Sequence, residues 1–309
     1  MFTDFFDFSQ TTIIENSQFL NSANNFLHFA VKRDDLIDPQ ISGNKWRKLK
    51  YNFKSLAHSP YTSIASFGGA FSNHIAALAA AGARAGVPTL GFIRTHEIDL
   101  NNPTLQLAHD KGMKLVALTR EEYRQRKNPD FIASMQKQYP DHYFVPEGGS
   151  NESASLGLKE LADEIKQQSN IKTIASAIGS GGTISGLLDH LPEHEFIGVA
   201  VVEDTPLLNE LEQKYGDRLT IVRSAMFGGY GKTSDELNEF CWNFTKQTQI
   251  PIEPVYTGKL FYALCEQELA LDKEVLAIHT GGLQGLKGLD YRRQCPPHLW
   301  QQVASLLDV

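Results

Sequence analysis

Five cationic side chains lie close together in ISGNKWRKLKYNFK, residues 41–54: Lys45, Arg47, Lys48, Lys50 and Lys54. A helix over this segment has an apolar face made of Leu49, Phe53 and Leu56. Lys45 precedes Leu49 by four residues, so we expect it on the same inward face. A lysine removed from water has a lowered pKa, and its amine can then attack a carbonyl near neutral pH. We expect Lys45 to do this chemistry and the other four cations to be surface charge.

A glycine-rich segment, GSGGTISGLL (179–188), follows a predicted strand and opens a predicted helix. Its first backbone N–H groups would point toward one spot, where the helix dipole also favours an anion. It is not a Walker A loop, because no Gly-Lys-Ser/Thr follows, and Ile184 occupies the last glycine position of the dinucleotide motif. A turn that only permits close helix packing is the alternative. We expect a phosphate monoester to bind at Ser180, Gly181, Gly182 and Thr183.

A second strand-to-helix turn lies in SFGGAFSNH (66–74), with Ser72 as the expected N-cap of the helix. Ser72, Asn73 and His74 would then surround a helix N-terminus whose backbone donors could hold a carboxylate. Plain capping by Ser72 is the alternative on propensity alone. The position of the triplet at the carboxyl end of a strand favours a binding site.

The elements that must position these residues follow an alternating pattern. Apolar runs typical of strands cover 62–69, 88–94, 114–119, 142–149, 173–179, 196–202 and 273–282, and helical patterns, among them 121–138 and 155–167, separate them. Such alternation predicts an α/β protein with parallel sheets and right-handed crossovers. Ligands of such sheets bind beyond the carboxyl ends of the strands. Four turns of small polar residues are expected there: GGAFSNH, PEGGSNE, GSGGTIS and HTGGLQG.

Composition narrows the possible partners and compartment. The 309 residues carry a net charge of −7, which argues against nucleic acid as a main partner. No apolar run is long enough for a membrane span, and the N-terminal MFTDFFDFSQ lacks the pattern of a signal peptide, so we expect a cytoplasmic protein. Cys241, Cys265 and Cys295 are widely spaced and are expected to be thiols; no metal site is predicted.

A reactive lysine together with a phosphate-binding turn indicates a phosphorylated aldehyde cofactor. Pyridoxal 5'-phosphate (PLP) meets both requirements, with an internal Schiff base to Lys45 and its phosphate on residues 180–183. PLP acts as an electron sink, while the protein selects which bond of the substrate breaks.

The same residues resemble a known family. Segments KRDDLIDPQISGNKWRKLKY, SFGGAFSNH, GSGGTISGL, VYTGK (255–259) and HTGG (279–282) are similar, in order, to those of the PLP enzymes related to 1-aminocyclopropane-1-carboxylate (ACC) deaminase and D-cysteine desulfhydrase. The resemblance spans nearly the whole chain. It implies the fold-type II architecture of the tryptophan synthase β subunit, with two α/β domains whose twisted sheets are mainly parallel. The small domain would be 48–155, the large one 1–47 with 156–309, and PLP would lie in the cleft.

The resemblance also implies roles for individual residues. Lys45 would be the Schiff-base lysine and the base at the α-carbon, and Asn73 would bind the 3'-oxygen of PLP. Ser72 and His74 would contact the substrate. Tyr256 would lie near the substrate, Tyr230 of FGGYGK is a weaker candidate, and a homodimer is the family habit. The chain departs from the family at Phe71, where Gln usually precedes Ser-Asn.

Position 257 distinguishes the two family activities. ACC deaminases have Tyr-Glu where this chain has Tyr256-Thr257, and D-cysteine desulfhydrases are similar to this chain in having Tyr-Thr. A hydroxyl opposite the pyridine nitrogen gives a weaker electron sink, adequate for α,β-elimination of a good leaving group. D-cysteine, giving pyruvate, ammonia and sulfide, is therefore the first expected substrate. ACC deamination and D-serine dehydration are alternatives within catalysis. A PLP-binding carrier or regulator, or a doubly wound domain for an unrelated nucleotide, is the alternative outside it.

Overall fold

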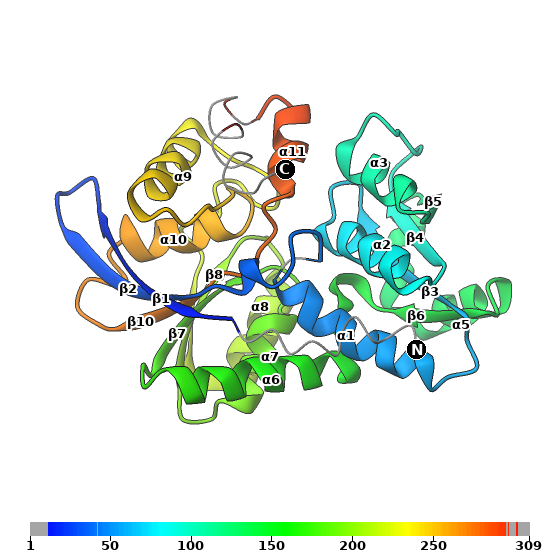
Figure 1. Ribbon diagram of the computed structural model, residues 1–309, viewed down its shortest axis with the longest axis horizontal. Coiled ribbons are helices and arrows are strands. Elements are labelled where there is room, and N and C mark those ends of the chain that lie inside the picture. The colour runs from blue at the N-terminus through cyan, green and yellow to red at the C-terminus, as the bar shows by residue number, and fades with distance from the viewer. Residues whose placement is uncertain (1–11, 42, 295, 297–300, 302–309) are drawn as a thin grey trace. The chain divides into compact units, whose positions relative to one another are not determined.

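The computed structural model describes residues 12–41, 43–294, 296 and 301, and contacts divide them into two units (Figure 1). Unit 1 contains the described residues from Gln40 to Leu158. Unit 2 contains those from 12 to Pro39 and from Lys159 onward. Unit 1 thus interrupts unit 2 in the sequence and includes Lys45. The domain boundaries expected from the sequence, with 48–155 as the small domain, stay a prediction.

Unit 1 contains a four-stranded parallel sheet in the order β5-β4-β3-β6. The strands are β3 (Ser63–Gly69), β4 (Thr89–Arg94), β5 (Lys114–Leu118) and β6 (His142–Val145), which confirms the four predicted strands of this region. The helices are α1 (Asn44–Ala57), α2 (Asn73–Ala85), α3 (Pro103–Asp110), α4 (Arg120–Arg124) and α5 (Pro129–Gln138), with short 3-10 turns η3 (Gln125–Lys127) and η4 (Glu147–Gly149). Because all four strands are parallel, their carboxyl ends share one edge.

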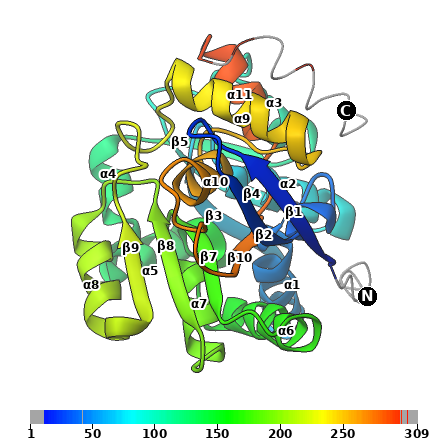
Figure 2. The same ribbon diagram turned by 90° about the vertical axis from the view of Figure 1, so that its left-hand side faces the viewer.

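Unit 2 contains a six-stranded sheet in the order β1-β2-β10-β7-β8-β9, in which only β1 and β2 pair antiparallel. Its strands are β1 (Ile14–Leu20), β2 (Phe26–Lys32), β7 (Thr173–Ile178), β8 (Glu195–Ala200), β9 (Leu219–Val222) and β10 (Val275–Ile278). Figure 2 shows β7, β8 and β9 side by side, with α8 next to β9. The helices are α7 (Gly182–His190), α8 (Thr205–Tyr215), α9 (Asp235–Thr248), α10 (Thr257–Cys265) and α11 (Gly285–Tyr291), with 3-10 turns η2 (Asp34–Leu36) and η5 (Gly216–Arg218). Helix α6 (Glu152–Gln168) contains the boundary with unit 1.

The four turns of small polar residues follow neighbouring strands within each unit. GGAFSNH and PEGGSNE follow β3 and β6, which pair directly in unit 1. GSGGTIS and HTGGLQG follow β7 and β10, which pair directly in unit 2. Each pair of turns therefore lies at the carboxyl edge of its sheet, where ligands of parallel sheets bind.

One predicted helix is wrong as a single element. The segment 121–138 forms α4, the turn η3 and α5 instead of one continuous helix. Asn128 ends the first part and caps the second by accepting a hydrogen bond from the backbone N–H of Asp130. Pro129 follows as the first helical residue, where its missing N–H costs nothing.

Aromatic side chains form much of the core of both units. In unit 2 the rings of Phe244 and Phe261 lie 4.6 Å apart, centroid to centroid, and Phe29 stacks on Phe244 at 5.9 Å. In unit 1 Phe67 and Phe92, on neighbouring strands, stack at 5.2 Å. These side chains are nearly all inaccessible to water, so each sheet is anchored by burial of large apolar surface.

Within the described residues no helix is both long and apolar enough to cross a membrane. The same part of the chain holds no group of three or more His, Cys, Asp or Glu side chains arranged for a metal ion. Cys241 and Cys265 are buried thiols, and Cys295 lies outside the described residues.

Helix α1 packs tightly against the first part of α6. A β-carbon added to Gly157 would lie 2.0 Å from the backbone oxygen of Arg47, far inside van der Waals contact. The close approach of the two backbones requires a glycine at this position, and it holds the helix that carries Lys45.

We therefore predict that Gly157→Ala lowers the free energy of unfolding by about 1–3 kcal/mol, because the added methyl group overpacks the contact between α1 and α6. Urea unfolding followed by circular dichroism measures this. Leu156→Ala is the matched control on the same helix: Leu156 is 50% exposed, and its truncation should change stability by less than about 0.5 kcal/mol. A Gly157→Ala protein as stable as the unmodified one would contradict the packing described here.

Candidate active site

Lys45 lies in the first turn of α1, as the sequence predicts. The helix begins at Asn44, and Leu49, Phe53 and Leu56 are buried along it. Lys45 as a residue is half-buried, and burial of its amine lowers the pKa to about 8 from an ordinary 10.5. The negative charge of Glu147 opposes this effect in part. An appreciable fraction of the amine is therefore unprotonated near neutral pH, as nucleophilic attack on a carbonyl requires.

The prediction that the neighbouring cations are surface charge is wrong for three of them. Arg47, Lys48 and Lys50 are only 3%, 1% and 8% exposed, and Lys54 is half-buried. The reason is that α1 is covered on several sides rather than on one. The α6 backbone approaches Arg47, and residues 148–151 cover the side of α1 that carries Lys48.

Lys48 forms part of the same buried environment as Lys45. Its Nζ donates hydrogen bonds to Ser150 Oγ at 2.9 Å and to the Gly148 carbonyl at 3.5 Å. Burial lowers its pKa well below 10.5, and repulsion by the charge of Lys45 lowers it further. The carbonyl of Lys48 accepts a bond from Asn52, whose side-chain oxygen accepts one from Asn151. These bonds fasten α1 to the turn that follows β6.

Ser72 and Asn73 begin helix α2 beside this region. The Ser72 hydroxyl accepts a long hydrogen bond, 3.4 Å, from the backbone N–H of Ile75, so its N-cap role is confirmed. Both Ser72 and Asn73 are half-buried. Asn73 is the first helical residue, where a helix N-terminus favours a negatively charged group.

His74 points into unit 1 rather than toward its surface. It is 3% exposed, and its Nε2 lies 2.8 Å from Ser66 Oγ, which also donates to the carbonyl of Val145. Burial and the nearby charges of Lys45 and Lys48 lower its pKa well below 6.5, so the ring is neutral. This location indicates that His74 supports the β3 turn from behind.

In unit 2 the turn at residues 179–182 joins β7 to α7. Gly181 is the N-cap with φ of +78°, a left-handed conformation that favours glycine, and it supplies no side-chain acceptor for the first turn of the helix. Ser180 is exposed, and Thr183 is 5% exposed. The N-terminal amides of α7 therefore form the kind of site that binds a phosphate group.

Two tyrosines lie next to this turn. A β-carbon on Gly179 would lie 2.9 Å from Cε1 of Tyr256, so the ring lies directly against the backbone after β7. Tyr230 packs edge-on against Tyr256 with ring centroids 5.8 Å apart. Lys259, fully buried, donates hydrogen bonds of 2.7 Å to the carbonyls of Met226 and Gly229 and thereby fixes the loop that carries Tyr230.

Glu253 organises the start of α10. Its buried carboxylate accepts hydrogen bonds from the backbone N–H groups of Val255, Tyr256 and Thr257 at 2.6, 2.8 and 2.9 Å. Burial raises the pKa of Glu253 to about 7, and these hydrogen bonds oppose the rise. Thr257 is fully buried, and its hydroxyl accepts from the Glu253 N–H at 3.1 Å and lies 3.3 Å from Glu253 Oε1.

His279 fixes the HTGG turn after β10. Its Nε2 bonds to the carbonyl of Pro251 at 2.7 Å, and a carbonyl can only accept, so Nε2 carries the proton. Nδ1 accepts from the backbone N–H of Gly281 at 3.2 Å. The ring thus connects the HTGG turn to the segment that leads to Glu253.

Each unit gathers one chemical function. In unit 1 the amine nucleophile, Lys45, lies in the same buried environment as His74. Ser72 and Asn73 form the N-terminus of the helix that contains His74. Unit 2 brings together residues 179–183, Tyr230 and Tyr256: an anion site flanked by aromatic rings.

Sequence reasoning missed four residues that organise these groups: Lys48, Glu147, Glu253 and Lys259. For Lys48 a signal was present, because three residues after Lys45 on a helix is the same face. For Glu253 no signal was used, because no helix start was predicted after it; the structure places α10 there. Glu147 and Lys259 act on groups distant in sequence, so no local pattern indicates their roles.

Comparison with known proteins identifies a family. Residues 8–281 match the family model described as pyridoxal-phosphate dependent enzyme. The chain is 33% identical over 282 residues to a provisionally named ACC deaminase of Thermotoga maritima, covering 83% of this chain and 89% of that protein. It is 31% identical over 278 residues to a protein of Pyrococcus horikoshii with the same provisional name, covering 82% and 84% of the two chains.

Solved structures agree with this assignment. A crystal structure of an ACC deaminase homologue superimposes with a TM-score of 0.73 at 26% identity, covering 91% of this chain and 89% of that one. These findings confirm the predicted fold-type II architecture and the family resemblance found in the sequence.

The lowered pKa of Lys45 is directly measurable on cofactor-free protein. We predict that an amine-acylating reagent labels Lys45 half-maximally near pH 8, because only the neutral amine reacts. Glu147→Gln should move this midpoint to lower pH, since the charge that raises the pKa is removed. Peptide mass spectrometry reports the labelling, with exposed Lys137 as the internal reference. A midpoint near 10.5 would show that the amine is not desolvated, and a midpoint near 8 that Glu147→Gln leaves unchanged would show that the charge of Glu147 does not act on it.

Proposed function

Because the chain belongs to the pyridoxal-phosphate dependent enzymes, we propose that it catalyses α,β-elimination from a small amino acid, with D-cysteine as the first candidate. It is an enzyme, and its cofactor is PLP. The observation that carries the proposal is the desolvated amine of Lys45 in the same unit as the Ser72-Asn73 helix N-terminus, in a chain with Tyr-Thr at positions 256–257. The products from D-cysteine would be pyruvate, ammonia and sulfide.

The residues present fit the chemistry of PLP. Lys45 supplies an amine of lowered pKa for the aldehyde carbon, and the uncapped N-terminus of α7 supplies backbone donors for the phosphate. We propose that Lys45 with Asn73, and Ser180 to Thr183, hold one PLP molecule. When bound, the cofactor supplies an electron sink for the charge left by bond breaking at the α-carbon.

The chain's own residues would handle the proton and the substrate. The Lys45 amine would accept the proton from the α-carbon, because at a pKa of about 8 half of it is neutral near pH 8. The β-substituent then leaves with its bonding electron pair. Ser72 and Asn73 bind the substrate carboxylate at the N-terminus of α2, with His74 supporting them from the buried side.

Tyr256 and Tyr230 form the aromatic side of the proposed substrate site. Their edge-on contact and the packing of Tyr256 on Gly179 hold Tyr256 beside the phosphate turn. We propose Tyr256 as a catalytic residue near the leaving group, and Tyr230 as a substrate contact. Thr257 is proposed to face the pyridine nitrogen; its hydroxyl is oriented by Glu253, whose pKa burial raises to about 7.

ACC deamination is the second candidate, and it rests on the names of the two relatives from Thermotoga maritima and Pyrococcus horikoshii. D-serine dehydration is a third, because hydroxide would leave by the same elimination. A neutral Thr257 in place of an acidic side chain favours elimination over opening of a cyclopropane ring, which needs a stronger electron sink. We further propose a cytoplasmic homodimer that acts on small amino acids, without a nucleic-acid or membrane partner.

The test of the proposed function is a substrate panel. Release of the 2-oxo acid from D-cysteine, D-serine, L-serine and ACC gives kcat/KM for each. We predict the highest value for D-cysteine, by at least about tenfold, since thiolate is the better leaving group. Turnover of ACC alone would contradict the inference from Thr257.

A pair of variants on one helix makes this test specific. Lys45→Ala should abolish turnover of every substrate, because it removes both the covalent anchor and the base. Lys54→Ala, also on α1, should retain activity. Activity that survives Lys45→Ala would overturn the assigned role of this residue.

A further inference from the structure

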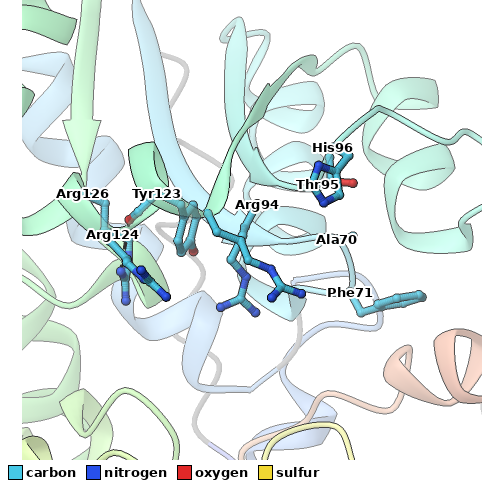
Figure 3. A pocket seen from close by; sticks show the side chains of 9 residues that line it. Ala70, Phe71, Arg94, Thr95, His96, Tyr123, Arg124 and Arg126 are labelled. Atoms are coloured by element: carbon cyan, nitrogen blue, oxygen red, sulfur yellow. Dashed lines mark hydrogen bonds between the residues drawn. The ribbon is translucent and has the colours of Figure 1, made fainter.

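An arginine-lined cavity of about 600 Å³ opens in unit 1, outside the residues assigned above (Figure 3). The side chains that define it are Phe71, Arg94, Arg120, Tyr123, Arg124 and Arg126. Its volume is that of a small-molecule site, and its concave form suits a compact ligand rather than a polymer.

The cavity has an excess of positive charge in a chain of net charge −7. Arg126 is paired with Glu147, Nε to Oε2, at 2.5 Å. Across the described part of the chain, Arg94, Arg120 and Arg124 have no acidic side chain within 4.0 Å. Three guanidinium groups around one cavity repel one another, and an anion bound between them would relieve that repulsion.

Two of the arginines are held in place by Tyr123. Figure 3 shows its ring between Arg94 on one side and Arg124 and Arg126 on the other. The guanidinium carbons of Arg94 and Arg126 lie 5.4 and 4.6 Å from the ring centroid, within range of cation–π attraction. The ring is 2% exposed, and its hydroxyl donates to Glu147 Oε1 at 2.6 Å. Guanidinium groups held this way are preorganised for an anion that accepts two parallel hydrogen bonds, such as a carboxylate.

Two residues of the cavity wall, Arg94 and Phe71, adjoin the turn that leads to Ser72. Arg94 is the last residue of β4, at the carboxyl edge of the sheet. Its Nη2 lies 3.7 Å from the position that a β-carbon of Gly69 would take, so it lies along the turn that leads to Ser72. Phe71, in the cavity wall, directly precedes Ser72.

We propose that this cavity binds an acidic group on the side chain of the amino-acid substrate. The proposal rests on the function proposed above and goes beyond its three candidates, none of which has an acidic side chain. The preferred substrate would carry a second negative charge in addition to its α-carboxylate and the leaving group on its β-carbon, and aspartate serves as a binding probe for that charge. Arg94 and Arg124 are then specificity-determining residues, and Arg126 is fixed by Glu147 as part of the wall.

Aspartate and asparagine test the proposal, because they differ in charge but hardly in size. Each is titrated, as both enantiomers, into the PLP-loaded enzyme, and binding is followed by the change in cofactor absorbance. We expect the better aspartate enantiomer to bind at least about tenfold more tightly than the corresponding asparagine, the effect of a charge-assisted hydrogen bond. Equal affinities would overturn the proposal.

Variants locate the effect in the cavity. Arg94→Gln and Arg124→Gln should each remove about tenfold of the affinity for aspartate and leave that for asparagine within about twofold. Arg124 is exposed on α4, so its variant keeps the test valid if Arg94→Gln fails to fold. Arg223→Gln, at an exposed ion pair in unit 2, is the matched control and should change neither. Equal weakening of both amino acids would overturn the proposal.

Two further outcomes are separable. If the unmodified protein shows no absorbance from bound PLP, the proposed function is wrong. If the absorbance is present but aspartate binds no more tightly than asparagine, only the inference about the cavity is wrong. Succinate, which lacks an amino group, should compete with aspartate. Calorimetric binding of succinate that leaves the aspartate titration unchanged would assign the cavity to a separate effector and overturn the substrate assignment.

Discussion

Desolvation of the amines on α1 is the constraint on which the rest of the site depends. An ammonium group removed from water loses proton affinity, and this makes Lys45 a nucleophile near neutral pH. The same burial lowers the pKa of Lys48, and the two amines repel each other when both are charged. Glu147 opposes the effect at Lys45, and it is itself held by Tyr123 and Arg126. The reactivity of one amine therefore depends on the packing of α1 against α6 and on the turn that follows β6.

The fold places chemistry at sheet edges, and buried acids and bases then fix it there. In unit 2 Glu253 binds three successive backbone amides and orients the Thr257 hydroxyl, while Lys259 fixes the loop of Tyr230. In unit 1 the neutral His74 supports the turn of Ser72 and Asn73 from inside. A family of enzymes that shares one cofactor can change its substrate by altering residues around these fixed groups, and Phe71, where the family usually has Gln, lies in the wall of the arginine-lined cavity.

Many helix starts, caps and turns were predictable from the sequence, because each depends on residues within its own segment. The start of α1 at Asn44, the cap at Ser72 and the turns after β3, β6, β7 and β10 follow from periodicity, capping and glycine content. The hairpin of β1 and β2 was not predicted, since the polar IENSQFL lacks the apolar run of a parallel strand. The burial of Arg47, Lys48 and Lys50 was mispredicted, because charged side chains are usually exposed. Only the tertiary contacts of α1 with α6 and with residues 148–151 show that they are buried. The convergence of Arg94 with Arg126 depends on sheet order, which no local pattern contains.

We propose that Lys45, and not the more deeply buried Lys48 one turn later, forms the covalent bond to PLP. Reduction of the PLP-loaded enzyme with borohydride fixes the cofactor irreversibly to its lysine, and mass spectrometry of the digested protein locates it. We predict the pyridoxyl phosphate group on Lys45 alone. Its appearance on Lys48, or on any other lysine, would contradict the account.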